Sequence, residues 1–183
     1  MPYALASGFF PAHSRAAHGL VHYVLAHGSR LLGVPRADAH ITYSNKPYGS
    51  GLGEVYGLSM SRFMADNDHP DQLVLSLYGM IAIGMTPGTY ISGEAISVVP
   101  VNGAYYRSMY MPPNSGRHAS YLDTLRLLLI HARGEVIGAT TGLDLAFATP
   151  RAWLADGKQI EVQKAPTSFG KISYTLDRSG SHV

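Results

Sequence analysis

Residues 70–85 read PDQLVLSLYGMIAIGM, and this stretch is apolar except for its first turn, Ser76 and Gly79. Asp68 or Asn67 can cap a helix here, and a proline is tolerated in the first turn. Apolar side chains recur around the whole helix, with a main stripe of Leu73, Val74, Leu77, Tyr78 and Ile81 and a second side of Leu75, Met80 and Ile83. A helix that is apolar nearly all round is buried, so we expect this helix at the centre of the fold.

Helical periodicity precedes and follows this segment, and strands come last. Apolar side chains at helical spacing predict helices over residues 14–33, 53–67 and 120–132. After Gly134 the apolar residues alternate instead, in the sets Leu143, Leu145 and Phe147; Ile160 and Val162; and Ile172, Tyr174 and Leu176. Alternation of this kind is typical of an antiparallel sheet. The sequence therefore predicts an α+β protein, with a helical domain in residues 1–133 and an antiparallel β-domain in residues 134–183.

The composition excludes several classes of protein. A hydrophobic content of 46% and a charged content of 14% indicate a folded chain. The net charge of +2 comes from scattered basic residues, so no nucleic-acid partner is expected. The chain has no cysteine, which excludes disulfides, thiolate–metal sites and thiol nucleophiles. No membrane span or signal peptide is visible, so we expect a soluble protein and leave the compartment open.

The segment 84–118, between two predicted helices, is rich in Gly, Pro, Tyr and Asn. Long loops without secondary structure are uncommon in compact domains and are often functional. Glu94 is the only acidic residue between Gln72 and Leu122, and it follows a glycine, which allows the backbone to approach a ligand closely. Glu94 is therefore the first candidate for a positioned base. The alternative is a loop carboxylate that bonds nearby backbone N–H groups or Arg107.

Four stretches of the chain resemble the C-terminal third of bacterial six-hairpin glycosidases. They are YGSGLGE at 48–54, SGE at 92–94, MPPNS at 111–115 and LDTLRLL at 122–128. The tail looks like the small β-domain appended to such proteins, on the evidence of ATPRAWL at 148–154, APTSFG at 165–170 and ISY at 172–174. The resemblance covers nearly the whole chain, and its patterns identify no single substrate family.

The resemblance implies a carbohydrate-active hydrolase that needs no cofactor, built as an (α/α)6 toroid of twelve helices. Residues 1–133 hold only about four predicted helices, so they are expected to form part of such a toroid, with 84–118 as its active-site loop. The β-domain is expected to be incomplete as well. In this family the general base precedes the last inner helix, which is the place of Glu94. The general acid would then lie upstream of Met1, and the isolated chain would be inactive.

Other site residues follow from the same resemblance and from side-chain chemistry. Glu54 is the second catalytic candidate, and its alternative role is to stabilise the first turn of a helix. Tyrosines can stack on sugar rings or simply pack between loop and helix ends. The expected substrate-binding residues are Tyr48, Tyr90, Tyr105, Tyr106 and Arg107. No metal site is expected, because the pair His18 and His22 lacks a third ligand.

Two other functions stay open. A polysaccharide lyase of toroid type would use a Tyr or His to remove the proton beside a uronate, with Arg107 neutralising the carboxylate. A non-catalytic product would bind carbohydrate weakly or be inactive. The expected partner is an oligo- or polysaccharide, with no membrane partner. If helices of the toroid are missing, apolar faces of helices 14–33 and 70–85 are exposed and favour self-association.

Overall fold

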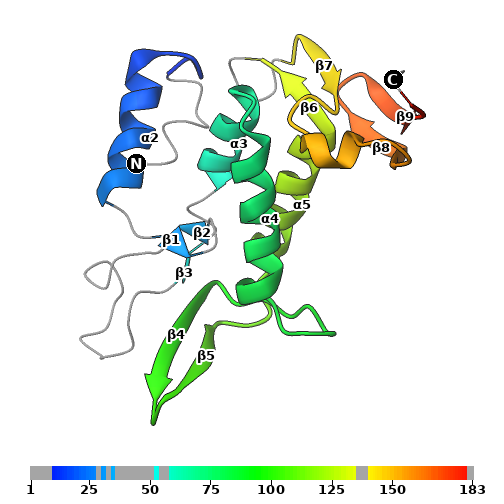
Figure 1. Cartoon of the computed structure of the whole chain (residues 1–183). Coiled ribbons are helices and arrows are strands. Elements are labelled where there is room, and N and C mark those ends of the chain that lie inside the picture. The colour runs from blue at the N-terminus through cyan, green and yellow to red at the C-terminus, as the bar shows by residue number, and fades with distance from the viewer. Residues whose placement is uncertain are drawn as a thin grey trace.

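The computed structural model describes residues 10–27, 30–31, 34–35, 52–53, 58–134 and 140–180. Within these ranges the chain forms helices and small antiparallel sheets, which confirms the α+β class (Figure 1). The helices are α2 (Arg15–His27), α3 (Leu58–Asp66), α4 (Pro70–Gly84), α5 (Ser115–Leu129) and the short 3-10 helix η1 (Arg151–Leu154). The strands are β1 (Arg30–Leu31), β2 (Val34–Pro35), β3 (Leu52–Gly53), β4 (Ala95–Val101), β5 (Ala104–Tyr110), β6 (Ile130–Arg133), β7 (Gly142–Leu145), β8 (Gln159–Thr167) and β9 (Gly170–Asp177).

The core lies where helices α2 to α5 meet. Helices α3, α4 and α5 contact one another, and α4 and α5 run side by side through the centre of the molecule (Figure 1). The buried apolar cluster comprises Ala17, Val21, Met60, Phe63, Met64, Ala65, Leu73, Leu77, Leu127, Leu128 and Ala148. Burial of apolar surface contributes about 25 cal/mol per Å², so this cluster is the main source of stability in the helical part.

Helix α4 is buried on one face only, so the prediction that it is buried all round is wrong. Leu73 and Leu77 are buried, whereas Leu75 is 47% exposed and Tyr78 is 54% exposed. The reason is that α3 and α5 pack against one side of α4. Tyr23 of α2 is likewise exposed, at 56%. Self-association through exposed apolar residues of these two helices stays a prediction.

The segment 84–118 is not a structureless loop, which corrects the prediction. Strands β4 and β5 form a hairpin within it, and Val101 pairs with Ala104 across the turn. The turn residues Asn102 and Gly103 have φ angles of 51° and 81°, as in the Asn-Gly turns that favour two-residue hairpins. The hairpin projects from the end of α4 (Figure 1). Strand β3 pairs with β4 as a third strand.

The predicted helix boundaries shift at three places. The first helix ends at His27, before the predicted end at residue 33. The second begins at Leu58 instead of residue 53, because Gly53 lies in β3 and pairs with Ala95. The helix expected over 120–132 runs from Ser115 to Leu129. Its Ile130 is extended, and the residues that follow pair with β7.

Strands β8 and β9 confirm two of the alternating sets predicted for the C-terminal part, whereas β7 ends at Leu145 and leaves Phe147 of the third set outside a strand. Strands β8 and β9 pair in an antiparallel hairpin, with partly buried Ile172, Tyr174 and Leu176 on one side of β9. This part of the chain is attached to the end of α5. The Tyr174 hydroxyl donates a hydrogen bond of 2.7 Å to the Leu129 carbonyl, and the buried Thr149 hydroxyl donates to the Leu128 carbonyl.

The helices of the described ranges are short. None of them combines the length with the hydropathy that crossing a bilayer requires.

Two leucines of α5 test this packing. Leu128 is 0% exposed, and Leu122 is 61% exposed. We expect Leu128→Ala to lower the free energy of unfolding by about 2–5 kcal/mol, because it leaves a cavity in the core. Leu122→Ala is the matched control and should change it by less than about 0.5 kcal/mol. Urea denaturation followed by circular dichroism measures both, and equal losses would contradict this core.

Candidate functional site

Glu94 lies in a bend directly before β4, and it is partly buried. Its backbone is held by Arg117 of α5. The Gly93 carbonyl accepts a hydrogen bond from Arg117 Nε at 2.7 Å. The Glu94 carbonyl accepts one from Arg117 Nη2 at 3.4 Å. Glu94 is therefore anchored through its main chain by a side chain that comes from a distant part of the sequence.

Arg117 is 0% exposed and is among the largest fully buried side chains of the described residues. Its guanidinium reaches the last residue of α4, where a Cβ built on Gly84 would lie 2.8 Å from Nη1. The carboxyl end of a helix carries a partial negative charge, which favours a cation. The end of α4 and the two carbonyls thus offset the desolvation of the buried charge.

The first turn of α5 is itself tied to the same place. The side chain of Asn114 caps the helix by accepting a hydrogen bond of 2.9 Å from the Arg117 N–H. The Asn114 N–H donates to the Ser92 carbonyl at 2.8 Å, and the Ser92 hydroxyl donates to the Asn114 carbonyl at 3.1 Å. Ser92 also bridges to Met85, directly after α4. The end of α4, the start of β4 and the start of α5 therefore meet around Glu94.

Tyr90 lies four residues before Glu94, and it is 58% exposed. Its φ of 53° is in the left-handed region, which costs a residue with a side chain of this size about 1–3 kcal/mol. The conformation is held by Thr86 and His118. The Tyr90 N–H donates to the Thr86 carbonyl at 2.9 Å, and its carbonyl accepts from His118 Nε2 at 2.8 Å.

Three other predicted binding residues lie in β5 of the hairpin. Tyr105, Tyr106 and Arg107 pair through their backbones with Pro100, Val99 and Val98 of β4. Arg107 pairs with Val98, which is about 13 Å along the strand from Glu94 at about 3.3 Å per residue. Arg117 contacts the Glu94 segment through the carbonyls of Gly93 and Glu94.

Tyr48 and Glu54 lie outside the described residues. Of the predicted site residues that the structure describes, Glu94 and Tyr90 lie together in one short segment, residues 90–94.

Sequence analysis missed the two residues that hold this segment, Arg117 and His118. Periodicity predicted the start of the helix at residue 120, so both were counted in the loop. The signal that could have found the true start is Asn114, which follows two prolines and can cap a helix. Their partners lie 24 and 28 residues away in the sequence, at a spacing that no local pattern reveals.

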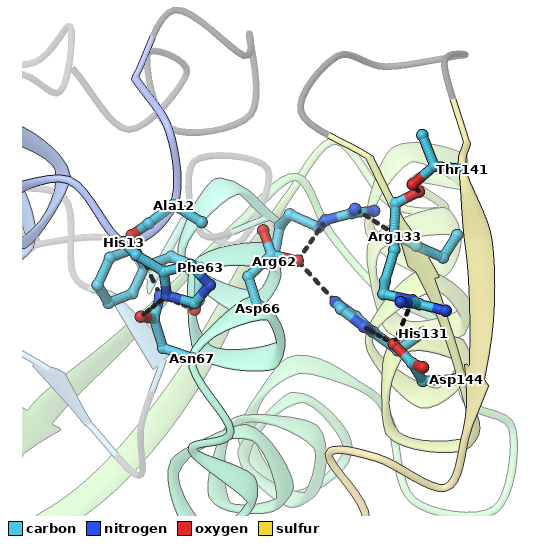
Figure 2. Close-up of polar contacts among 11 residues, drawn as sticks. Ala12, His13, Arg62, Phe63, Asp66, Asn67, His131, Arg133, Thr141 and Asp144 are labelled. Atoms are coloured by element: carbon cyan, nitrogen blue, oxygen red, sulfur yellow. Dashed lines mark hydrogen bonds and ion pairs between the residues drawn. The ribbon is translucent and has the colours of Figure 1, made fainter.

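A second polar cluster joins α3 to the β6–β7 sheet (Figure 2). Asp66 Oδ1 accepts hydrogen bonds from Arg62 Nε at 3.0 Å and from His131 Nε2 at 2.6 Å. Asp144 Oδ2 lies 3.0 Å from Arg133 Nε and 3.6 Å from His131 Nδ1. The side chain of His131 is only 6% exposed. This cluster connects α3 to the β6–β7 sheet. A substrate cannot reach its histidine, because the His131 side chain is buried.

The second cluster is separate from the Glu94 segment. Asp66 ends α3 shortly before the start of α4, whereas Glu94 follows the end of α4. A helix of 15 residues is about 21 Å long at about 1.5 Å per residue. Carboxyl groups that act together on a glycosidic bond are about 5–9.5 Å apart, so Asp66 and Asp144 cannot be the catalytic partner of Glu94.

Asp123 is a third feature with unusual electrostatics. Burial raises the pKa of its carboxyl group above the ordinary value of 3.8, against the opposing effects of Arg62 and Arg126. The ionised form is therefore disfavoured in the folded state relative to the unfolded state.

Metal-binding geometry and similarity to known proteins give no further indication of function in the described part of the chain. Among the residues that the structure describes, no group of three or more His, Asp or Glu side chains is arranged to hold a metal ion. Comparisons with protein-family models, with curated proteins and with solved structures give no significant match to this chain.

Two glycines that each lie against an arginine test the anchoring of Glu94. A Cβ at Gly84 would lie 2.8 Å from Arg117 Nη1, and a Cβ at Gly142 would lie 2.7 Å from Arg133 Nη2. Arg117 is buried, whereas the Arg133 side chain is 59% exposed and can swing away. We expect Gly84→Ala to lower the free energy of unfolding by about 1–3 kcal/mol, and Gly142→Ala to cost clearly less. Urea denaturation decides, and equal costs would contradict the anchoring role of Arg117.

Asp123→Asn tests the electrostatics of α5. A raised pKa in the folded state means that the contribution of the protonated carboxyl to stability is full below pH 3.8 and is lost as the pH rises through the folded-state value. We therefore expect the variant to melt at a higher temperature than the wild type at pH 7, and at the same temperature near about pH 3. Thermal melts at both pH values measure this difference. A lower melting temperature of the variant at pH 7 would show that the pairing with Arg62 and Arg126 outweighs burial.

Proposed function

We propose that this chain carries part of the active site of a glycoside hydrolase, with Glu94 as the general base and Glu54 as the second carboxylate. The proposal takes up the resemblance to six-hairpin glycosidases and adds a contact between segments that are distant in the sequence. It assigns the general acid to this chain. The alternative, an acid supplied from upstream of Met1, is tested below.

The observation that carries the proposal is the pairing of β3 with β4. Gly53 and Ala95 are partners in this antiparallel ladder, and Cα atoms of such partners are about 4.5–5.5 Å apart. Glu54 directly follows Gly53 in the chain, and Glu94 directly precedes Ala95. The ladder thus joins the two segments from which the predicted carboxylates depart. The carboxylate of Glu54 lies outside the described residues, so its position belongs to the proposal.

The chemistry needs two carboxyl groups on opposite sides of the scissile bond. In the inverting mechanism that we propose, the Glu94 carboxylate removes a proton from a water molecule as the water oxygen attacks the anomeric carbon. The Glu54 carboxyl group donates its proton to the glycosidic oxygen as the bond from that oxygen to the anomeric carbon breaks. The two groups would be about 6.5–9.5 Å apart to leave room for the water.

The surroundings of Glu94 support the role of a positioned base. Arg117 binds the main-chain carbonyls of Gly93 and Glu94, so it fixes the backbone of the segment that carries the base. A group that is fixed in place before the reaction acts more effectively. The exposed ring of Tyr90 offers an apolar face with a hydroxyl at its tip, which matches a sugar ring.

Isosteric carboxylate variants test the proposal. We expect Glu94→Gln and Glu54→Gln each to lower kcat by about 10²–10⁴-fold, because each removes a proton-transfer group. Release of reducing ends from a panel of neutral oligosaccharides measures the rate. Glu161→Gln is the matched control, because Glu161 is exposed on β8, and it should keep the wild-type rate.

Each result separates the possible assignments. Full activity of Glu94→Gln would refute the role of Glu94 as the base. If Glu54→Gln is fully active and Glu94→Gln is inactive, Glu54 is not the general acid, and the role of Glu94 as the base stands. A wild-type chain that hydrolyses nothing in the panel would contradict the assignment of the general acid to this chain.

A further inference from the structure

Two neighbouring residues of α5 hold the two described site residues. Arg117 donates to the carbonyls of Gly93 and Glu94, and His118 donates to the carbonyl of Tyr90. Both donors lie in the first turn and a half of the same helix. The backbone positions of Glu94 and Tyr90 are therefore fixed relative to one rigid element.

The exposed ring of Tyr90 is not explained by stability. The residue has a positive φ of 53°, where glycine would be free of strain, and its side chain is 58% exposed. Further contacts close the loop around it: the Ile91 N–H donates to the Thr86 hydroxyl at 2.8 Å, and the Thr86 N–H donates to the Ile91 carbonyl at 2.9 Å. Residues held in sparsely populated backbone regions cluster at functional sites, which points to a use for the exposed ring of Tyr90.

The charged residues of segment 86–111 indicate whether the sugar beside the Tyr90 ring is charged or uncharged. From Thr86 to Met111 the charged residues are Glu94 and Arg107. Arg107 pairs with Val98, which lies further along the hairpin. Within residues 86–94 the sequence has one charged residue, Glu94, so an anionic sugar beside Tyr90 would lie near a carboxylate of the same segment. This arrangement favours an uncharged sugar.

We propose that Tyr90 is a stacking platform for an uncharged sugar ring and that His118 is the positioning residue which holds the platform relative to Glu94. This inference rests on the glycoside hydrolase proposed above. His118 acts through the Tyr90 carbonyl and does not touch the sugar. Its loss should weaken sugar binding more than it weakens the fold.

Binding to the full chain carrying Glu94→Gln tests this without hydrolysis. The probes are maltotriose, cellotriose, xylotriose and mannotriose, with trigalacturonic acid as the charged comparison, measured by isothermal titration calorimetry. In this background we expect His118→Ala to raise the Kd of the neutral trisaccharide that binds by about tenfold, which corresponds to about 1.4 kcal/mol. Tyr90→Ala should raise it at least as much. His118→Gln keeps an N–H donor and should restore most of the affinity.

A structural role alone would not give this pattern. We expect His118→Ala to lower the melting temperature by no more than about 4 °C, the shift for about 1 kcal/mol in a chain of this size. The matched control is His22→Ala, an exposed histidine of α2, which should leave both the Kd and the melting temperature unchanged.

The outcomes separate this inference from the proposed function. The role of His118 is overturned if the trisaccharide binds equally well to His118→Ala. It is also overturned if His118→Gln fails to restore binding. Binding that Tyr90→Ala leaves unchanged overturns the platform, and binding of trigalacturonic acid alone overturns the uncharged sugar. If the wild type cleaves a neutral oligosaccharide but none of these variants affects binding, the inference fails while the hydrolase stands. If no saccharide binds or is cleaved, both fail.

Discussion

The hydrogen bonds of the buried Arg117 guanidinium hold the part of the molecule around Glu94, where α4 ends and β4 and α5 begin. Removing a charge from water costs several kcal/mol unless hydrogen bonds replace those of the solvent. Arg117 donates hydrogen bonds to the main-chain carbonyls of Gly93 and Glu94 before β4, and its guanidinium lies against Gly84 at the carboxyl end of α4. The hydrogen bonds to Gly93 and Glu94 go to main-chain carbonyls, so they fix the backbone of this segment relative to α5. A shift of the segment before β4 away from α5 would break these two hydrogen bonds.

The central pair of helices divides the molecule into two ends that are held in different ways. At the start of α4, the large apolar cluster and the Asp66–His131 contact join α3, α5 and the β6–β7 sheet. At the end of α4, the described apolar cluster is small, with Ile96 packed against Ile83 and Met109. The hydrogen bonds of Arg117 and Asn114 also hold this end together. Hydrogen bonds are directional whereas apolar packing is not, so this end is suited to fix the orientation of a site.

The sequence allowed some elements to be predicted and not others, for identifiable physical reasons. Helix α4 and the β8–β9 hairpin were predicted because each follows a regular apolar period. The β4–β5 hairpin was missed because residues 96–101 read ISVVPV, where two adjacent valines and a proline break the alternation that predicts a strand. Its Asn-Gly turn was the available signal. Glu94 and Tyr90 stood out by their residue types, whereas Arg117 and His118 acquire their roles only through long-range contacts.

The first turn of α5 therefore couples stability to the geometry of the site. Asn114 caps this turn and is also bonded to Ser92, two residues before Glu94. The cap, the buried Arg117 and the exposed His118 contact belong to one short stretch of chain, so they form and are lost together. A sugar bound beside Tyr90 and Glu94 would contact none of these three side chains in the arrangement proposed. Their effect on binding would come entirely from where they hold the backbone, which is why substitutions remote from a ligand can change its affinity.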